Sequence, residues 1–428
     1  MILYHGEVLD NDKQEELLDA LKKDVYAPIL RGESLATERV IAACDRLATK
    51  ILRGEFDTLI DPFLSHFEVD EGRFQDMVRL FLREGLEYKC AIELRDDAKI
   101  IDGKVLRKRY PLGVLLHIAA GNLDVLPAYS VIEGLLAGNI NILKLPTGDS
   151  GLSVRLLDEL IRIEPALKEY VYVFDVPSAE TDSLKKLAEL ADGVVVWGGD
   201  EAVKAARNMV DPNTKIIAWG HKLSFAYAQP DAGDEELKKL AREICRTNQL
   251  LCSSCQGIFV DTNSPQVQLE FARRFFEILK EADREARPVD YGMKAAGAIR
   301  LYHERLNQHK TGRQIFKEGG VSVLVCEDEE LTLSYLYRNV WIKRLPFGCI
   351  GELKKYKQYL QTAAVLTGDR KMFEIIGMAL AAIGVVRITS AENMSRSICG
   401  EAHDGTYALR EYSRIVELEI VLNSCKNL

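Results

Sequence analysis

Hydrophobic residues in the first hundred positions recur at intervals of three to four, with charged residues between them. This spacing places the apolar side chains on one face of a helix. The segments that follow it are Gln14 to Lys23, Ser34 to Leu52 and Gly72 to Arg83. The chain is therefore predicted to begin with a helical segment.

The pattern changes to a period of two near residue 91. Residues Ala91 to Arg95 and Lys104 to Arg107 alternate on either side of Asp102-Gly103. An Asp-Gly pair suits the positive backbone dihedral angles of a tight hairpin turn. We therefore expect a two-stranded hairpin at about residues 91–110.

From Gly113 onward, short apolar runs alternate with helical patterns. The runs are Gly113 to Ile118, Ile140 to Leu145, Val171 to Phe174, Val194 to Trp197 and Ile216 to Trp219. A repeat of roughly 20 to 30 residues is what right-handed βαβ crossovers require. The pattern predicts a doubly wound, mostly parallel sheet that binds ligands at the carboxyl ends of its strands.

A second alternating stretch begins near Ser224. Its runs are Gly257 to Val260, Val321 to Val325, Ala363 to Thr367 and Val385 to Ile388, with a helix at Pro265 to Ala282. The fold class is therefore α/β with two doubly wound domains. We expect domains at residues 1–220 and 221–400 and a C-terminal return segment at 401–428. No Pro/Gly/Ser-rich linker separates them, so a shared interface that encloses a cleft is expected.

Composition narrows the function classes. The 428 residues are 47% hydrophobic, and the formal net charge is −9. This acidic balance argues against nucleic-acid binding, which lysine and arginine drive. No apolar run reaches the roughly 18 residues of a membrane span, and the start lacks the zones of a signal peptide. We expect a cytoplasmic protein. Cys252-x-x-Cys255 has no second ligand pair for zinc, so no metal site is expected.

Two polar residues follow predicted strands in the first domain. Asn122 ends a small-residue loop that includes Ala120, and its amide is suited to stabilising an oxyanion. Lys144 ends the next strand and can reach a ribose or phosphate. Seen alone, each has a plainer interpretation: Asn122 as a helix cap and Lys144 as a solvated lysine.

Two further segments carry possible chemistry. Cys252 lies in a polar turn between a helix and a strand, where nearby positive potential, including a helix N-terminus, can make a thiol nucleophilic. An isolated cysteine is more often a small buried apolar group. Gly198 and Gly199 follow a strand and open a helix, so their backbone N–H groups can face a pyrophosphate. No G-x-G-x-x-G motif accompanies them.

These features together resemble the aldehyde dehydrogenase superfamily, and most closely the acyl-CoA reductases of bacterial bioluminescence systems. The segment from Pro111 to Pro146 is similar to the stretch that runs from oxyanion asparagine to cofactor lysine. Cys252 has the spacing of the catalytic cysteine from the strand that ends Phe259-Val260, whereas Cys255 lies three residues late. Weaker similarity continues through Trp219 to Lys222 and through His403-Asp404-Gly405.

The resemblance implies an aldehyde dehydrogenase-like fold with a cofactor domain, a catalytic domain and an oligomerisation hairpin. It implies that Cys252 forms an acyl-enzyme and that Asn122 stabilises the oxyanion. It also implies that Ala120, Lys144, Gly198 and Gly199 contact the cofactor. A homo-oligomer is expected, and an acyl-protein synthetase partner is conceivable from the same resemblance.

Two departures from the superfamily are informative. Aligning Gly220 and Lys222 on the E-L-G-G-K motif puts Ala218 where a glutamate activates water, so an acyl-enzyme is not readily hydrolysed. This favours reduction of an activated acyl group. His221 is a candidate proton donor, although a structural role for it is equally compatible with the sequence.

The second departure concerns the cofactor. Thr147 stands where NAD-preferring relatives often carry an acid, so a 2′-phosphate is tolerated and NADP(H) is favoured over NAD(H). The E-x-F-G-P ribose-binding segment has no clean equivalent. The candidates are Trp341 to Arg344 and Leu345 to Gly348.

The sequence thus favours NAD(P)H-dependent reduction of an acyl-CoA to the aldehyde. The alternatives are an acyl-phosphate reductase of the glutamyl-phosphate reductase type, a general aldehyde dehydrogenase, and a non-catalytic binding or assembly component. An acyl-phosphate site needs basic residues near the thiol, for which the candidates are Lys222, Arg246 and Lys343. A redox or zinc role for Cys252 and Cys255 is a minor option.

Overall fold

The computed structural model describes residues 1–66, 71–94, 105–119, 125–307 and 313–419. It divides into two compact units, each described here by itself. The first unit contains residues 1–220 and the chain from Ser397 onward, and the second contains His221–Arg396.

The first unit is built on a seven-stranded sheet of order β2-β1-β6-β5-β4-β7-β8. Its strands are β1 (Ile2–Tyr4), β2 (Glu7–Leu9), β4 (Val114–Ile118), β5 (Ile140–Lys144), β6 (Val171–Phe174), β7 (Gly193–Trp197) and β8 (Lys215–Trp219). The last five run parallel and confirm the predicted strands. β1 and β2 add an antiparallel edge. They were not predicted, because three residues are too few to show a period.

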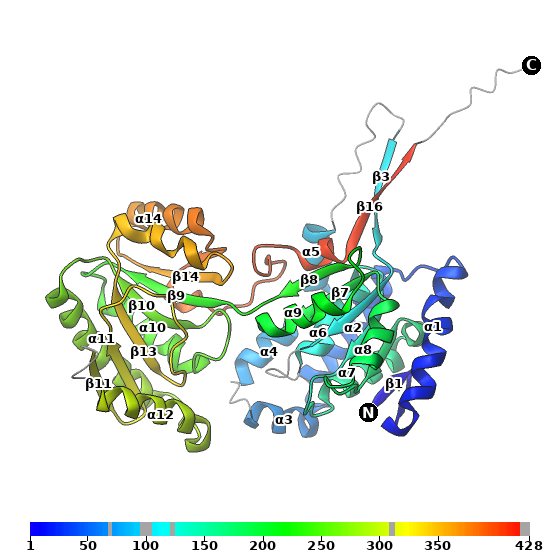
Figure 1. The fold of residues 1–428 in the computed structure, drawn as a ribbon, viewed down its shortest axis with the longest axis horizontal. Coiled ribbons are helices and arrows are strands. Elements are labelled where there is room, and N and C mark those ends of the chain that lie inside the picture. Colours follow the sequence, from blue (N-terminus) through cyan, green and yellow to red (C-terminus); the bar gives the residue numbers. More distant parts are fainter. Residues whose placement is uncertain (67–70, 95–104, 120–124, 308–312, 420–428) are drawn as a thin grey trace, which may run out of the picture. The chain divides into compact units, whose positions relative to one another are not determined.

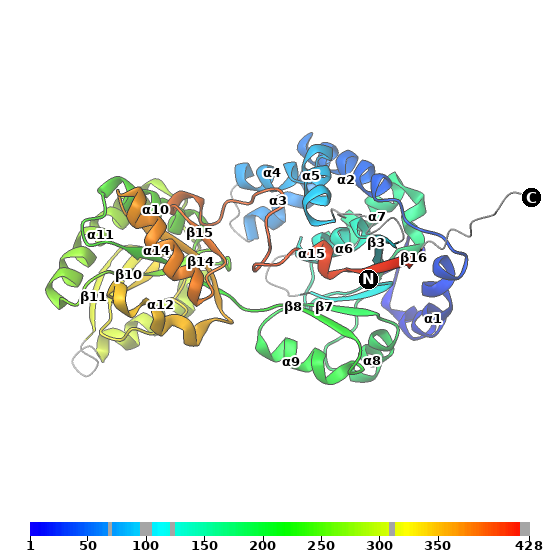
Figure 2. The same cartoon turned by 90° about the horizontal axis from the view of Figure 1, so that it is seen from above.

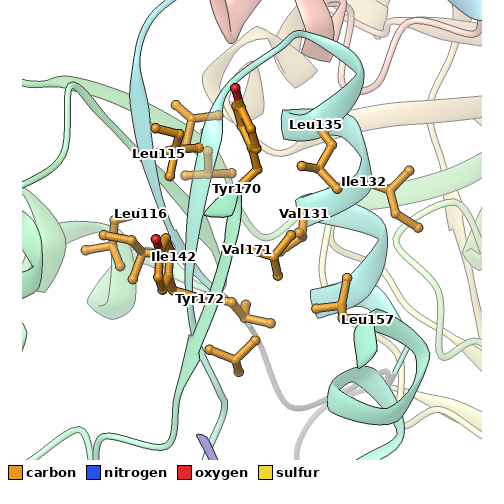
Figure 3. Close-up of a cluster of buried hydrophobic side chains, with 14 of the residues drawn as sticks. Leu115, Leu116, Val131, Ile132, Leu135, Ile142, Leu157, Tyr170, Val171 and Tyr172 are labelled. Atoms are coloured by element: carbon orange, nitrogen blue, oxygen red, sulfur yellow. The ribbon is translucent and has the colours of Figure 1, made fainter. Parts of the chain in front are cut away.

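Helices cover both faces of this sheet. Figure 2 shows α8 and α9 on one side and α2, α6 and α7 on the other. Their bounds are α2 (Thr37–Leu52), α6 (Leu126–Leu136), α7 (Leu152–Ile163), α8 (Thr181–Glu189) and α9 (Asp200–Met209). Figure 3 shows buried side chains of β4, β5 and β6, among them Leu115, Ile142 and Val171; Val171 lies toward α6 and α7, whereas Ile142 lies on the opposite face of the strands. These three side chains are almost fully buried, and each contributes about 1.5–3 kcal/mol of burial free energy.

The predicted helical segment is confirmed, with different internal boundaries. The remaining helices of the first unit are η1 (Asn11–Lys13), α1 (Gln14–Leu30), α3 (Asp57–His66), α4 (Glu71–Arg79), α5 (Arg83–Glu93), η2 (Pro165–Glu169) and α15 (Ala408–Glu411). The segment predicted as one helix from Gly72 to Arg83 is interrupted by turn residues 80–82, after which α5 begins.

The predicted hairpin at 91–110 is wrong in its pairing. Figure 1 shows a two-stranded ribbon in which β3 (Val105–Pro111) lies beside β16 (Ser413–Glu419). The two strands pair antiparallel along their full length. Ala91 and Glu93 belong to α5, where Lys89 pairs with Glu93 at 2.6 Å and stabilises the helix. Asp102-Gly103 lies outside the described residues. The alternating pattern of β3 is thus that of a strand, but its pairing partner is distant in the sequence and cannot be predicted from the local pattern.

The second unit contains another seven-stranded sheet, of order β11-β12-β13-β10-β9-β14-β15. Its strands are β9 (Leu223–Ala228), β10 (Cys255–Val260), β11 (Gln314–Glu318), β12 (Val321–Val325), β13 (Asn339–Arg344), β14 (Leu360–Leu366) and β15 (Arg387–Thr389). Six are parallel, and β11 joins antiparallel at one edge. The predicted strands are confirmed, while β11 and β13 were not predicted.

Alternate residues of the central strands pack into two separate cores. Ala226 and Ile258 join the cluster formed with α10 and α11, whereas Phe225 and Phe259 join the cluster formed with η3 and α14. The helices of this unit are α10 (Asp234–Thr247), α11 (Pro265–Glu285), α12 (Tyr291–Leu306), η3 (Phe347–Tyr356), α14 (Arg370–Ile383) and η4 (Ala391–Asn393). Among the helices of both units that the structure describes, none has the length and apolar character that a bilayer crossing requires.

Candidate active site

Lys144 is the last residue of β5, at the carboxyl edge of the first sheet. Its side chain is only 4% exposed, and its Nζ donates to Ser178 Oγ at 3.0 Å. Burial lowers the pKa of Lys144, and the carboxylate of Asp175 partly opposes this shift. The strand therefore fixes a desolvated donor at the edge where parallel sheets bind ligands. The interpretation as a freely solvated lysine does not hold.

Gly198 and Gly199 follow β7 at the same edge. Gly199 is the N-cap of α9, and its carbonyl accepts from the N–H groups of Ala202 and Val203 at 3.0 and 3.2 Å. A Cβ added at Gly199 meets no atom within 4 Å, whereas one at Gly198 meets the Cβ of Ala202 at 3.0 Å. The helix therefore begins beside open space, where its partial positive charge suits an anionic group.

The first sheet brings these residues to one edge because β5 and β7 both flank β4. Thr147 is exposed in the turn that follows β5. Asn122 and Ala120 belong to residues 120–124, outside the described part of the chain, so their roles stay predictions. Lys144, Gly198 and Gly199 together fit a dinucleotide: a buried donor and a helix start with room beside it.

A buried histidine that sequence reasoning gave no role links β4 to α6 and β5. His117 is fully buried in β4, with Nδ1 at 2.6 Å from Ser130 Oγ and Nε2 at 3.0 Å from Asn141 Oδ1. Asn141 Nδ2 donates to the Asn139 carbonyl at 2.8 Å, so Asn141 Oδ1 accepts and His117 Nε2 donates. Burial lowers the pKa of His117 to about 4, so the ring is neutral at pH 7.

The return segment reaches the carboxyl ends of β7 and β8. The ring of His403 lies 4.9 Å from that of Trp219 and 5.2 Å from that of Trp197, measured between centroids. Trp197 and Trp219 are the last residues of their strands and are almost fully buried. The His403-Asp404-Gly405 motif therefore covers this end of the first sheet.

Cys252 and Cys255 lie in very different surroundings in the second unit. Cys252 is exposed in the turn between α10 and β10, at the amino edge of the sheet. Cys255 is the first residue of β10, is fully buried, and donates from Sγ to the Gly257 carbonyl at 3.2 Å. Burial raises the pKa of Cys255 to about 12. Of the two thiols, Cys252 is the one that a substrate can reach.

The turn before Cys252 is held by unusual backbone and a buried amide. Asn248 and Gln249 have φ angles of 48° and 64°, a left-handed conformation that costs free energy for residues with a Cβ. Gln249 is 1% exposed; its Nε2 donates to the carbonyls of Cys255 at 3.0 Å and Asn339 at 3.2 Å. Its Oε1 accepts from the Asn339 N–H at 3.1 Å. These bonds offset the strain.

A second left-handed segment adjoins this turn. Leu336, Tyr337 and Arg338 have φ angles of 59°, 47° and 71°, and the Tyr337 N–H donates to the Asn248 carbonyl at 2.9 Å. Sequence reasoning missed both Gln249 and this segment, because neither carries a local motif. The segments suggested for ribose binding lie elsewhere: Trp341 to Arg344 is part of β13, and Leu345 to Gly348 follows its carboxyl end.

The electrostatic expectation for Cys252 needs correction. The helix that adjoins the turn, α10, ends at Thr247 and therefore presents its carboxyl end, which carries partial negative charge. It does not supply the positive potential of a helix N-terminus. The features of this turn that favour Cys252 as a nucleophile are its exposure and the hydrogen bonds that hold the turn.

The three basic candidates for an acyl-phosphate site already have partners. Arg246 pairs with Glu243, Lys343 pairs with Asp328, and Lys222 donates to the Gln358 carbonyl at 2.8 Å. Lys343 is also 2% exposed within β13. His221 is exposed just after β8. These lysines and this arginine therefore do not form a phosphate-binding cluster with Cys252.

The paired α/β units with these topologies define the fold of the aldehyde dehydrogenases. The NADP complex of glyceraldehyde-3-phosphate dehydrogenase GapN from Methanocaldococcus jannaschii superposes with a TM-score of 0.75 and 13% identity, over 97% of this chain and 95% of that one. An NADP-dependent enzyme of E. coli superposes with a TM-score of 0.74 and 14% identity, over 98% of both chains. The predicted fold is confirmed.

Sequence similarity then gives the family. A family model described as acyl-CoA reductase (LuxC) matches residues 34–415, and the chain belongs to this family. The long-chain acyl-protein thioester reductase of Vibrio harveyi is 24% identical over 76% of this chain and 68% of that protein. Family membership makes the chain an oxidoreductase of the aldehyde-forming acyl reductase class. The predicted resemblance is confirmed.

Proposed function

We propose that this protein reduces an acyl thioester to the aldehyde through a covalent acyl-enzyme on Cys252, with NAD(P)H as reductant. One observation carries the proposal. In a member of the acyl-CoA reductase family, the exposed thiol lies in a turn held by buried hydrogen bonds, while its neighbour Cys255 is buried as an inert thiol. The V. harveyi relative is named for acyl-protein thioesters, so an acyl-CoA and an acyl-protein are the two substrate forms to compare.

The acyl transfer is assigned to the second unit. The Cys252 thiolate attacks the carbonyl carbon of the thioester, a new carbon–sulfur bond forms, and the bond to the leaving thiolate breaks. The departing thiolate takes a proton from solvent. Asn122 is proposed to donate its amide to the oxyanion of the tetrahedral intermediate. His221, exposed after β8, is the candidate proton donor when the aldehyde leaves.

Cofactor binding is assigned to the carboxyl edge of the first unit. A bound nicotinamide cofactor supplies the hydride that takes the acyl group to the aldehyde level. Lys144 would donate to a ribose or phosphate, and Gly199 at the start of α9 would face the pyrophosphate. Thr147 places no carboxylate beside a 2′-phosphate, so NADPH is the proposed preference.

Ala218, which aligns with the glutamate that activates water in hydrolysing aldehyde dehydrogenases, favours reduction over hydrolysis. Ala218 lies in β8 with its methyl group exposed, and a methyl group cannot accept a proton from water. An acyl-enzyme without such a base persists long enough to be reduced. This favours the reductase over a hydrolysing aldehyde dehydrogenase.

The proposal is tested by mixing the protein with NADPH or NADH and one of three activated acyl groups: an acyl-CoA, the same acyl group on a carrier protein, or the acyl phosphate. We expect nicotinamide oxidation and aldehyde with a thioester, and little with the acyl phosphate. Aldehyde from the acyl phosphate alone, or aldehyde formation unchanged in Cys252→Ala, contradicts the proposal.

Self-association through the β3–β16 ribbon is part of the same proposal. The ribbon exposes Tyr110, Ile415 and Leu418 by 38–59% of their surface. A two-stranded ribbon with exposed apolar side chains gains free energy when a second copy covers them. Sedimentation of the wild type and of Ile415→Glu tests this: we expect an oligomer that the variant weakens, and a monomeric wild type contradicts it.

The proposed acyl-protein synthetase partner is tested separately. If the protein receives its acyl group from such a synthetase, acyl-loaded synthetase supports aldehyde formation at lower concentration than acyl-CoA does. Equal or weaker use of the acyl-loaded synthetase contradicts a dedicated partner.

A further inference from the structure

The pairing of β9 with both of its neighbours is irregular near the start of the strand. Its register with β10 shifts between Cys255 and Ile258, and its register with β14 shifts between Leu360 and Ala363. The extra residue lies in β10 on one side and in β14 on the other, in both cases opposite the first residues of β9, near the amino edge of the sheet. Bulges free backbone groups from the ladder, and those groups need other partners.

The side chain of Ser224 supplies one such partner, for β14, and also binds the turn before β10. The residue is fully buried, its Oγ accepts from the Thr362 N–H at 3.1 Å, and it donates to the Cys252 carbonyl at 2.6 Å. The direction of both bonds is fixed. The Thr362 N–H can only donate, so the hydroxyl accepts there, and its single proton goes to the Cys252 carbonyl. One hydroxyl thus joins β14, β9 and the peptide of Cys252.

The other bonds of this turn act at different places. Ser254 Oγ accepts from the Leu251 N–H at 3.1 Å, which closes the turn on itself. Gln249 fixes the start of the turn to β10 and β13. Ser224 instead holds residue 252 itself, through the carbonyl next to the Cα that carries the thiol.

We infer that Ser224 is a positioning residue for the Cys252 thiol: its buried hydroxyl anchors the Cys252 peptide to the buried strand β9. The inference rests on the proposed function and deepens it. Covalent catalysis needs the sulfur within near-attack distance of the carbonyl carbon, and small displacements of a reacting group cost large factors in rate. Anchoring the exposed turn to a buried strand meets this need without touching the substrate.

The test compares Ser224→Ala, Ser224→Thr and Tyr227→Phe in the full chain. Ser224→Ala removes the hydroxyl, and Ser224→Thr retains it in a residue suited to strands. Tyr227→Phe is the matched control, because Tyr227 lies in the same strand and also has a buried hydroxyl. That hydroxyl donates to the Leu345 carbonyl at 3.0 Å, and Leu345 does not belong to the turn that carries Cys252. The measurements are kcat and KM for acyl-CoA, the melting temperature, and the alkylation rate of Cys252 by iodoacetamide.

We expect Ser224→Ala to lower kcat by about tenfold to a hundredfold with KM nearly unchanged, and to change the alkylation rate of Cys252. Ser224→Thr should recover most of kcat. Tyr227→Phe should lose comparable thermal stability and keep kcat and the alkylation rate. A purely structural role for Ser224 would instead make kcat follow the melting temperature in all variants.

The inference fails if Ser224→Ala keeps both kcat and the alkylation rate of the wild type, or if Tyr227→Phe loses as much kcat. Should Ser224→Ala not fold, Ser224→Cys takes its place, because cysteine nearly keeps the side-chain volume and its thiol donates only weakly. We then expect the kcat of Ser224→Cys to lie below that of Ser224→Thr. Alkylation needs no substrate. A wild type that reduces neither an acyl-CoA nor an acyl-protein thioester therefore refutes the proposed function, while the alkylation rates still decide the role of Ser224.

Discussion

The two units present their candidate residues at opposite edges of similar sheets. In the first unit, Lys144 and Gly199 lie where parallel strands end and the helix α9 begins. In the second unit, Cys252 lies after the end of α10 and before β10 begins. Strand ends that lead into helix starts offer N–H groups and positive potential, which suit an anionic cofactor. The opposite edge offers no such potential, and it suits a thiol that needs exposure and a fixed position.

This difference separates two tasks that one fold must perform. At the first edge, where we propose that the cofactor binds, Lys144 and Ser178 form a buried hydrogen-bonded pair. The second edge exposes Cys252 and buries Cys255, so exposure favours Cys252 as the proposed nucleophile. Variants at each edge should therefore change different measured quantities.

The largest effect is expected at Cys252. Cys252→Ser should lower aldehyde formation by about a thousandfold or more, because a serine hydroxyl without an adjacent base is a poor nucleophile. Cofactor binding, measured by nicotinamide fluorescence, should stay near that of the wild type. Loss of cofactor binding together with activity would contradict the proposal that the two edges have separate roles.

Cys255→Ala is the matched control for this comparison. The variant loses a buried thiol and should lose about 1–2 kcal/mol of unfolding free energy, yet keep most of its turnover. Loss of turnover in a folded Cys255→Ala variant would indicate that Cys255 is the nucleophile, and it would contradict the role proposed for Cys252.

His117 is expected to make the stability of the first unit depend on pH. Its pKa of about 4 in the folded protein lies below the ordinary 6.5, so only the unfolded chain takes up this proton between those values. Its contribution to stability is full above pH 6.5 and is lost as pH falls toward 4. Between pH 7 and pH 5 the wild type should lose about 2 kcal/mol that His117→Gln does not lose.

The measurement for His117 is the unfolding free energy of both proteins at pH 7 and pH 5 in denaturant. The second unit provides the contrast, because His221 and His303, its described histidines, are exposed. Equal pH dependence in the wild type and in His117→Gln would show that this ring does not make the first unit sensitive to acid.

Lys144→Met tests the binding edge directly. Methionine retains much of the length of the side chain and removes the ammonium group that donates to Ser178. We expect the KM for the nicotinamide cofactor to rise by about tenfold, the value of one lost charged hydrogen bond. The alkylation rate of Cys252 should not change. A change in alkylation with an unchanged cofactor KM would reverse the assignment of the two edges.

The smallest effect is expected at Thr147. Thr147→Glu introduces an exposed carboxylate, which repels a 2′-phosphate through a screened interaction. The ratio of kcat/KM for NADPH over NADH should fall by about fivefold, and Thr147→Gln should leave it unchanged. A ratio that rises or stays constant in Thr147→Glu would remove Thr147 from cofactor selection.

Much of the fold follows from local sequence, since buried parallel strands read as apolar runs. The runs that became β4 to β8 show this, as does the helical pattern of α2. Longer-range features do not follow. β3 alternates in sequence, but its partner β16 lies three hundred residues away, at Ser413–Glu419. β1 is too short to show any period.

The candidate site divides in the same way. Lys144 and Cys252 were found because their positions relative to strands resemble a known family. Gln249, Ser224 and His117 were missed because their roles depend on burial and on partners from distant strands. The suggested helix N-terminus near Cys252 was wrong, although the order of helix and strand in the sequence already predicted the opposite helix end.

The central claim is that the acyl group passes through Cys252. The most direct measurement is the mass of the intact protein after mixing with an acyl-CoA in the absence of nicotinamide, followed by peptide mapping. We expect one added acyl group on the peptide at Cys252, absent in Cys252→Ala and present in Cys255→Ala. An unmodified wild type, or an acyl group that remains in Cys252→Ala, would contradict it.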